Sequence, residues 1–297
     1  MTLAVDGHAV WLPGLVALGA VVGWVAGMFG VGGGFLLTPL LTVVFRVPIE
    51  IAVGTGLCQM VGTSCGALLR HQRLAQGEIR FDLLIIAGSL VGVEAGARLL
   101  GALGSARPIG VLGHPVPAAR LVVELLYVVL LLSAAVMFGR DRSAAPDPFA
   151  PPPGPLARVR LPPLVEFPAV PLTAVSATLV AYIGLGLGVM SGLLGLGGGV
   201  ALMPILVYGF GFPIRHAAGT GIAALFLTSV VGTFAHALRG HVHLGIAMVL
   251  LVGATVSAQF GALASHRLRT HTLRRLFAAL ILVTVCAVAW DLVRQVS

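Results

Sequence analysis

The stretch that decides the fold reads GMFGVGGGFLLTP over residues 27–39, and a copy of it, GLLGLGGGVALMP, occupies residues 192–204. Each copy holds three consecutive glycines and ends in a proline. Glycine runs interrupt helices, and inside a membrane a broken backbone is tolerated only where protein or a wet cavity covers it. The two motifs therefore predict half-length helices over 34–46 and 199–210, each beginning at a glycine break.

The motifs belong to a longer internal repeat. A shift of 165 residues superposes twenty identical residues between positions 19 and 71 without a gap. Self-similarity at a fixed period marks structural copies. The shared positions include a glycine ridge and a Gly-Thr-Gly block in each half, namely Gly19, Gly23, Gly27, Gly54, Thr55 and Gly56, with Gly184, Gly188, Gly192, Gly219, Thr220 and Gly221. We therefore divide the chain into a first membrane repeat (10–138), a proline-rich linker (139–171) and a second membrane repeat (172–295).

Composition places this chain in a membrane. It is 58% hydrophobic and only 9% charged, with a mean hydropathy of +1.05. A soluble domain is about one quarter charged, so a soluble enzyme, a nucleic-acid-binding domain and a disordered chain are excluded. Apolar runs of spanning length lie at 10–29, 51–70, 82–101, 119–138, 173–193, 216–237, 243–264 and 273–294. The sequence predicts an all-α, multi-pass membrane protein. It also predicts a short, irregular loop over 101–118.

The arginines predict how the two repeats are related. If all ten segments change sides, twelve arginines fall on one side and six on the other, whereas re-entrant short segments give nine on each side. Cytoplasmic loops carry the excess of arginine, so ten crossings with both termini outside are favoured. Five segments per half is an odd number, which predicts an inverted repeat of the kind common in secondary transporters.

The candidate binding residues are neutral. Free N–H groups and the positive dipole end of a short helix suit a small anion, and Thr55 and Thr220 would add hydroxyl donors at less cost than a buried charge. The glycines assigned to this site are Gly32, Gly33, Gly34, Gly197, Gly198 and Gly199. For both the glycines and the two threonines, a structural role is the alternative. Small residues also pack helices closely, and threonine hydroxyls also bond to carbonyls of their own helix.

Three titratable residues are candidates for proton coupling: Glu94, His71 and His236. Glu94 lies in the middle of a predicted helix, where a carboxylate is costly unless it is protonated, paired or facing water. Arg98, four residues on, is the alternative partner. The two histidines occupy matching helix ends, where they would also neutralise terminal carbonyls.

No enzyme chemistry is predicted. The three cysteines lie inside apolar runs and are odd in number, and their spacing suits neither a disulfide framework nor zinc. We find no catalytic constellation, and we expect no cofactor, no metal site and no nucleic-acid partner. The expected partners are a small anion and the lipid bilayer.

With both glycine-proline motifs, both Gly-Thr-Gly blocks and the repeat in hand, the chain resembles the sulfite exporter TauE/SafE family over roughly residues 10–295. The resemblance implies a transporter of the prokaryotic plasma membrane, and we expect the bacterial plasma (inner) membrane. The implied substrates are small sulfur-containing or carboxylated anions, such as sulfite, sulfoacetate, another organosulfonate or thiosulfate. It assigns the family's motif to Gly30, Gly32, Gly33, Gly34 and Pro39, and to Gly195, Gly197, Gly198, Gly199 and Pro204. The linker is longer and richer in proline than the family pattern.

The leading interpretation is a secondary transporter that moves a small anion by alternating access. A passive anion channel built on the same site is the first alternative. A membrane enzyme or a non-transport assembly subunit is the second, and it leaves the doubled motif unexplained. Two substitutions are expected to be mild for folding: Gly19→Ala, on the ridge, and Thr55→Val.

Overall fold

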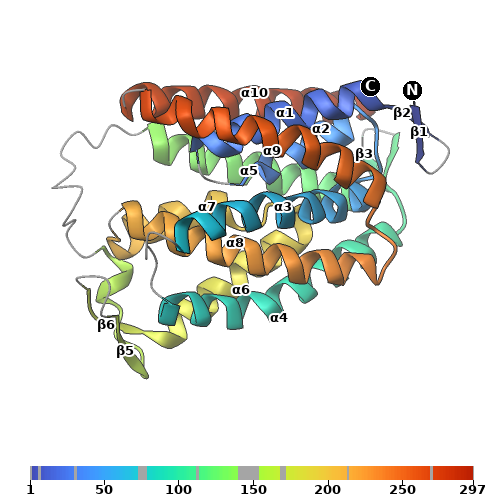
Figure 1. Cartoon of the computed structure of the whole chain (residues 1–297). Coiled ribbons are helices and arrows are strands. Elements are labelled where there is room, and N and C mark those ends of the chain that lie inside the picture. The colour runs from blue at the N-terminus through green and yellow to red at the C-terminus, as the bar shows by residue number, and fades with distance from the viewer. Residues whose placement is uncertain are drawn as a thin grey trace.

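The computed structural model describes residues 2–5, 8–29, 32–72, 79–111, 114–139, 154–167, 172–212, 214–267 and 270–296. Within these residues the long helices form one bundle, and the strands are short and lie at its ends (Figure 1). The predicted all-α membrane class is confirmed.

The helices follow the repeat. The first half contains α1 (Leu12–Phe29), α2 (Gly34–Val43), α3 (Ile49–Gln72), α4 (Ile79–Gly104) and α5 (Ala118–Gly139). The second half contains α6 (Ala177–Leu194), α7 (Gly199–Pro204), which continues as the π-helical turn η2 (Ile205–Phe210), then α8 (Ile214–Ala237), α9 (Leu244–Arg267) and α10 (Thr270–Val296). Shifted by 165 residues, the bounds of α1 and α3 coincide with those of α6 and α8.

Seven of the described helices are long and apolar enough to cross a membrane: α1, α4, α5, α6, α8, α9 and α10. The 24-residue α3 is not among them, and it carries the polar residues Glu50 and Gln59. Two apolar helices are shorter, as the glycine motifs predict. They are α2, which ends at Val43 instead of residue 46, and the continuous helix Gly199–Phe210.

The bundle has two ends, a terminal face and a linker face. The start of α1 and the end of α10 lie at one end, which we call the terminal face (Figure 1). There α3 begins beside the end of α4, since a Cβ on Gly104 would lie 2.6 Å from Glu50 Oε1. The opposite end, called the linker face, holds the start of α4 and the short helix η1 (Leu156–Arg158).

In the described parts of the chain, three antiparallel hairpins lie at the ends of the bundle. They pair β1 (Thr2–Val5) with β2 (His8–Trp11), β3 (Ile109–Val111) with β4 (His114–Val116), and β5 (Leu164–Phe167) with β6 (Leu172–Ser176). The second hairpin corrects the expectation of an irregular loop over 101–118. Ile109 pairs with Val116 and Val111 with His114. The β-branched residues on both strands favour this pairing.

The glycine ridges are packing surfaces. Gly19 faces Leu250 and Gly27 faces Ala258, so α1 runs parallel to α9, and a Cβ on Gly19 would lie 2.3 Å from the carbonyl oxygen of Leu250. The same arrangement joins α6 to α4, where Gly184 faces Ile85. This confirms the packing role of the ridges. It shows that the expectation of a mild Gly19→Ala was wrong, because a methyl group has no room against the partner's backbone.

Candidate functional site

The two glycine breaks meet in the middle of the bundle. A Cβ on Gly34 would lie 2.7 Å from the carbonyl oxygen of Gly195, so the backbones of the two breaks are in contact. Met60 and Leu225 lie halfway along α3 and α8, 165 residues apart, and both reach this point. A Cβ on Gly32 or on Gly197 would lie within 3.3 Å of both side chains. The structure thus brings together the two motifs that the sequence singled out.

Each short helix is preceded by a glycine, which has no side chain to cap the helix N-terminus. Gly33 precedes α2 and Gly198 precedes α7, and neither start has a side-chain capping hydrogen bond. Gly198 has a φ of 80° and is buried, and no atom of the described residues lies within 4 Å of its Cβ position. The N-terminus of α7 therefore adjoins open space among these residues, whereas a Cβ on Gly33 would lie 2.4 Å from Val22 Cγ1.

The polar side chains at the breaks are neutral. Tyr127 Oη donates to the carbonyl oxygen of Leu194 at 2.6 Å, and Thr228 Oγ1 donates to that of Gly197 at 3.1 Å. Ser229 Oγ is fully buried, lies 3.2 Å from the Cβ position of Gly197 and has no hydrogen-bond partner among the described residues. A hydroxyl without a partner in a buried site is a donor available to a ligand.

The two Gly-Thr-Gly threonines are buried in α3 and α8. Thr55 Oγ1 accepts a hydrogen bond of 3.0 Å from the backbone N–H of His243, in the turn between α8 and α9. Thr220 is fully buried in α8. The described contact of Thr55 is thus with the α8–α9 turn and not with a glycine break, while its role toward substrate stays a prediction.

This contact changes what Thr55→Val is expected to do. Valine fills the same space but leaves the His243 N–H without its acceptor, which costs about 1–3 kcal/mol. We expect a lower melting temperature for Thr55→Val in detergent, and a nearly unchanged one for Thr55→Ser, which keeps the oxygen. Equal melting temperatures for both variants and the wild-type protein would contradict this role.

The coupling candidates have partners in the structure. Glu94 accepts from Arg98 Nε at 2.7 Å, so the predicted i+4 partner is confirmed, and also from Arg239 Nη2 at 2.6 Å. His236 is fully buried, with its Nε2 2.8 Å from the carbonyl oxygen of Gly192 on α6. The partner of His236 is thus a carbonyl of α6, whereas the sequence suggested the carbonyls at the end of the helix that carries His236.

The remaining histidines near these residues differ. His71 belongs to α3, but its side chain lies outside the described residues. The ring of His241 lies 5.8 Å from that of His236. The pKa of the His241 side chain lies below its usual value, chiefly because the ring is partly buried; the charge of Glu50 opposes this shift and that of Arg239 adds to it.

Two cavities lie within the bundle. One of about 280 Å³ lies between α1, α3, α8 and α9 and is lined in part by Thr63, Thr255 and Gln259. It also reaches Gly27, near the end of α1. The other, of about 870 Å³, lies between α5 and α7–η2 and is mainly apolar. In the parts of the chain that the structure describes, no three His, Cys, Asp or Glu side chains are grouped to hold a metal ion.

Sequence reasoning missed Met60, Leu225 and Tyr127. The first two are separated by the repeat distance, which is a signal the sequence contains. Tyr127 is a hydroxyl-bearing side chain within the apolar helix α5, and such a group needs a partner when it is buried. Its partner, the break at Leu194, lies 67 residues away.

Comparisons with known proteins agree with the membrane architecture. The chain is 24% identical to "Probable membrane transporter protein YunE" of Bacillus subtilis (strain 168) over 288 residues, which cover 93% of this chain and 97% of the relative. It is 28% identical over 279 residues to a "Probable membrane transporter protein" of Xylella fastidiosa (strain Temecula1), covering 93% and 94%. It is 29% identical over 280 residues to "Probable membrane transporter protein YjnA" of Bacillus subtilis (strain 168), covering 91% and 96%. No solved structure matches it.

A family assignment covers most of the chain. The family described as "Sulfite exporter TauE/SafE" matches residues 15–288, which include both glycine motifs and helices of both halves. The spanning helices make this a multi-pass membrane protein, and the bacterial plasma membrane fits the family. From its motifs, its repeat and this match, the chain belongs to the sulfite exporter TauE/SafE family.

Proposed function

We propose that the chain is a secondary transporter that carries a small anion across the membrane by alternating access, with its site where the two glycine breaks meet. Membrane transport is the function that the family and the names of the relatives support, and they indicate a transporter rather than an enzyme. The observation that carries the proposal is that two broken helices begin beside one buried, neutral point.

The proposed repeat is inverted, with residues 10–138 and 172–295 as its copies and 139–171 as the linker. In support, the counterparts α3 and α8 run antiparallel, since Gly54 lies beside His236 and Leu57 beside Gly232. The pair α1–α9 becomes the pair α6–α4 under the same shift, and both pairs are parallel. A twofold axis across the helices produces this set of directions.

The proposed orientation puts the linker face in the cytoplasm and both termini outside. Arg80 at the start of α4, Arg158 in η1 and Arg275 in the first turns of α10 belong to the linker face. Cytoplasmic loops collect arginine, so this face is the candidate for the inside.

The proposed substrate is sulfite, thiosulfate, an organosulfonate or a similar small anion. The side chains that approach Gly197 are Leu225, Met60 and Ser229, all uncharged, so the attraction for an anion comes from helix N-termini and hydroxyl donors. Glu94, His71 and His236 stay predictions for proton coupling.

The test is uptake by the purified protein in liposomes. A panel of sulfite, thiosulfate, sulfoacetate, sulfate and small carboxylates is compared with and without an imposed proton gradient. We expect saturable uptake of a sulfur-containing anion that is accelerated by the same anion on the far side, because only a carrier shows counterflow. Uptake without saturation or counterflow would indicate a channel, and no uptake of any member would contradict the proposal.

A further inference from the structure

The cavity of about 280 Å³ lies on one side of the glycine breaks. Its walls include Ala67 of α3, Ile222 of α8, and Ala258 and Gln259 of α9. Ala67 and Ala258 belong to the parts of α3 and α9 that lead to the linker face. A Cβ on Gly66, also in its wall, would meet no atom within 4 Å. Along the described residues, the cavity therefore extends from the middle of the bundle toward the linker face.

The matching space on the other side is filled. Shifting these wall positions by 165 residues leads from Ala67, Ile222 and Ala258 to Gly232, Leu57 and Val93. A Cβ on Gly232 would lie 2.8 Å from Leu57 Cδ1 and 3.4 Å from Val93 Cγ1. Leu57 and Val93 are both fully buried. The residues that line open space in one half are thus in contact in the other.

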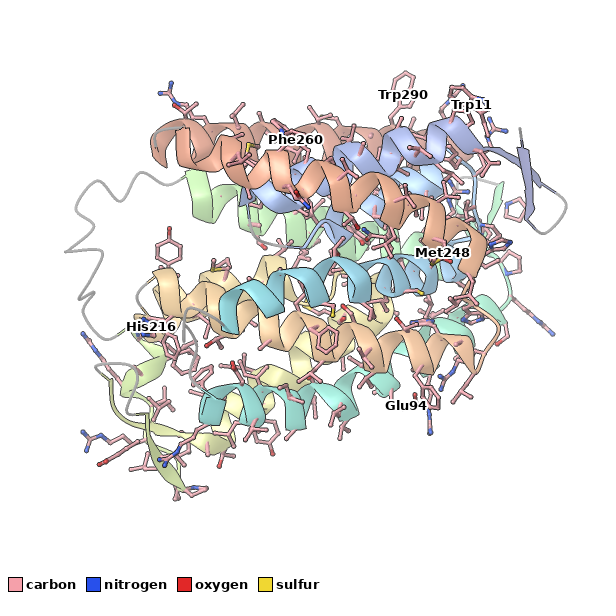
Figure 2. The ribbon with its side chains drawn as sticks, in the orientation of Figure 1. Trp11, Glu94, His216, Met248, Phe260 and Trp290 are labelled. Atoms are coloured by element: carbon pink, nitrogen blue, oxygen red, sulfur yellow. The ribbon has the colours of Figure 1, made fainter. Side chains whose placement is uncertain are left out.

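An ion pair joins two helices on the filled side. Glu94, the counterpart of Gln259, accepts two hydrogen bonds from Arg239. Its Oε1 accepts from Nη2 at 2.6 Å, and its Oε2 accepts from Nη1 at 3.4 Å. Arg239 also donates to the carbonyl oxygen of Ala235, which ties its guanidinium to α8. The pair therefore links α4 to the end of α8. Glu94 lies near the terminal face in Figure 2, well away from His216 at the start of α8.

The open side cannot form the same ion pair, because the residues at the matching positions are uncharged. Gln259 has no charge, and the counterpart of Arg239 is Leu74, whose position lies outside the described residues. The side chains of Arg239 and Glu94 are 24% and 37% exposed. An ion pair with this access to solvent is weak enough to break and re-form, as a gate must.

We propose that the structure is the state open to the linker face, and that the Glu94–Arg239 pair is the gate that holds the pathway shut toward the terminal face. This inference rests on the proposed transport function and names the residues that control access to its site. In the opposite state the pair is broken, Leu57 and Val93 separate from Gly232, and the Ala67–Ile222–Ala258 walls close.

Thiol labelling tests the gate without measuring transport. In the full-length protein with its three cysteines replaced, Val93→Cys reports on the closed side and Ala258→Cys on the open side. We expect Ala258→Cys to react about tenfold faster or more. Adding Glu94→Gln should speed labelling of Val93→Cys about tenfold and slow that of Ala258→Cys, since the two states exchange populations.

The matched control is Arg98→Gln. Arg98 also bonds Glu94, but it lies on the same helix, so its loss leaves α4 joined to α8 and both labelling rates unchanged. Should Glu94→Gln fail to fold, Arg239→Gln breaks the same link from the other side, and Glu94→Arg with Arg239→Glu should restore the wild-type rates.

Unchanged labelling of Val93→Cys after the link is broken would overturn the gate, as would an equal effect of Arg98→Gln. If labelling shifts while the liposomes show no uptake, the transport proposal fails and the gate stands; intact uptake with unshifted labelling removes the gate alone.

Discussion

Gly188→Val is expected to abolish the folded protein, whereas Gly186→Val, two residues away on the same helix, leaves it intact. A Cβ on Gly188 would lie 2.4 Å from the carbonyl oxygen of Ser89 and 2.8 Å from its Cα. Both are backbone atoms of α4, so no side-chain rotation relieves the overlap. Helices α4 and α6 must separate, which costs about 3 kcal/mol or more.

Gly186 is the matched control because it is exposed and its Cβ position meets no atom within 4 Å. The measurement is the yield of monodisperse protein after detergent extraction, followed by size-exclusion chromatography. We expect no monodisperse peak for Gly188→Val and a wild-type peak for Gly186→Val. Equal peaks would show that the glycine ridge does not hold the helices together.

Gly198→Leu is expected to remove transport while the protein still folds. No atom of the described residues lies within 4 Å of its Cβ position, so the leucine enters the open space at the start of α7, where the anion is proposed to bind. A hydrogen bond to a charged group is worth about 1.5–3 kcal/mol, so losing one such contact lowers apparent affinity about ten- to hundredfold. The measurement is uptake of the best anion from the liposome panel.

Backbone strain is the competing explanation, and Gly240→Leu controls for it. Gly240 lies in the α8–α9 turn, with a φ of 74° close to the 80° of Gly198, and its Cβ position is equally open. A non-glycine residue in this region costs about 1–2 kcal/mol at either site. We expect both variants to lose similar thermal stability, with uptake lost only in Gly198→Leu. Wild-type uptake in Gly198→Leu would place the site elsewhere.

Local patterns predicted the helices because they depend on neighbouring residues alone. Seven of the eight apolar runs located a spanning helix to within a few residues, and the three glycines located the start of α2 and of α7. The run over 51–70 located α3, which is not apolar enough to count among the spanning helices. The ion pair of Glu94 with Arg98 was also predictable, since residues four apart meet on any helix. The hairpin over 109–116 was missed because the prolines of that loop suggested irregular structure.

Several parts of the candidate site were beyond sequence reasoning because they depend on which helices touch. The partner of Glu94 across the bundle is 145 residues away, and the N–H bonded to Thr55 is 188 residues away. No periodicity within one helix specifies such a contact. The severity of Gly19→Ala was missed for the same reason, since the obstacle is the backbone of α9.

The sequence by itself determined the membrane class, the two copies and the two helix breaks, since hydropathy, the 165-residue repeat and glycine are properties of the chain. Only the tertiary structure decided that the breaks meet, that Met60 and Leu225 both approach them, and that a cavity in one half corresponds to residues in contact in the other. The two halves share their apolar and glycine patterns, so those patterns predict the same helices in both halves and do not specify how closely the helices pack on each side. The difference arises from packing between helices, where Leu57 and Val93 close on Gly232 while Ile222 and Ala258 line open space.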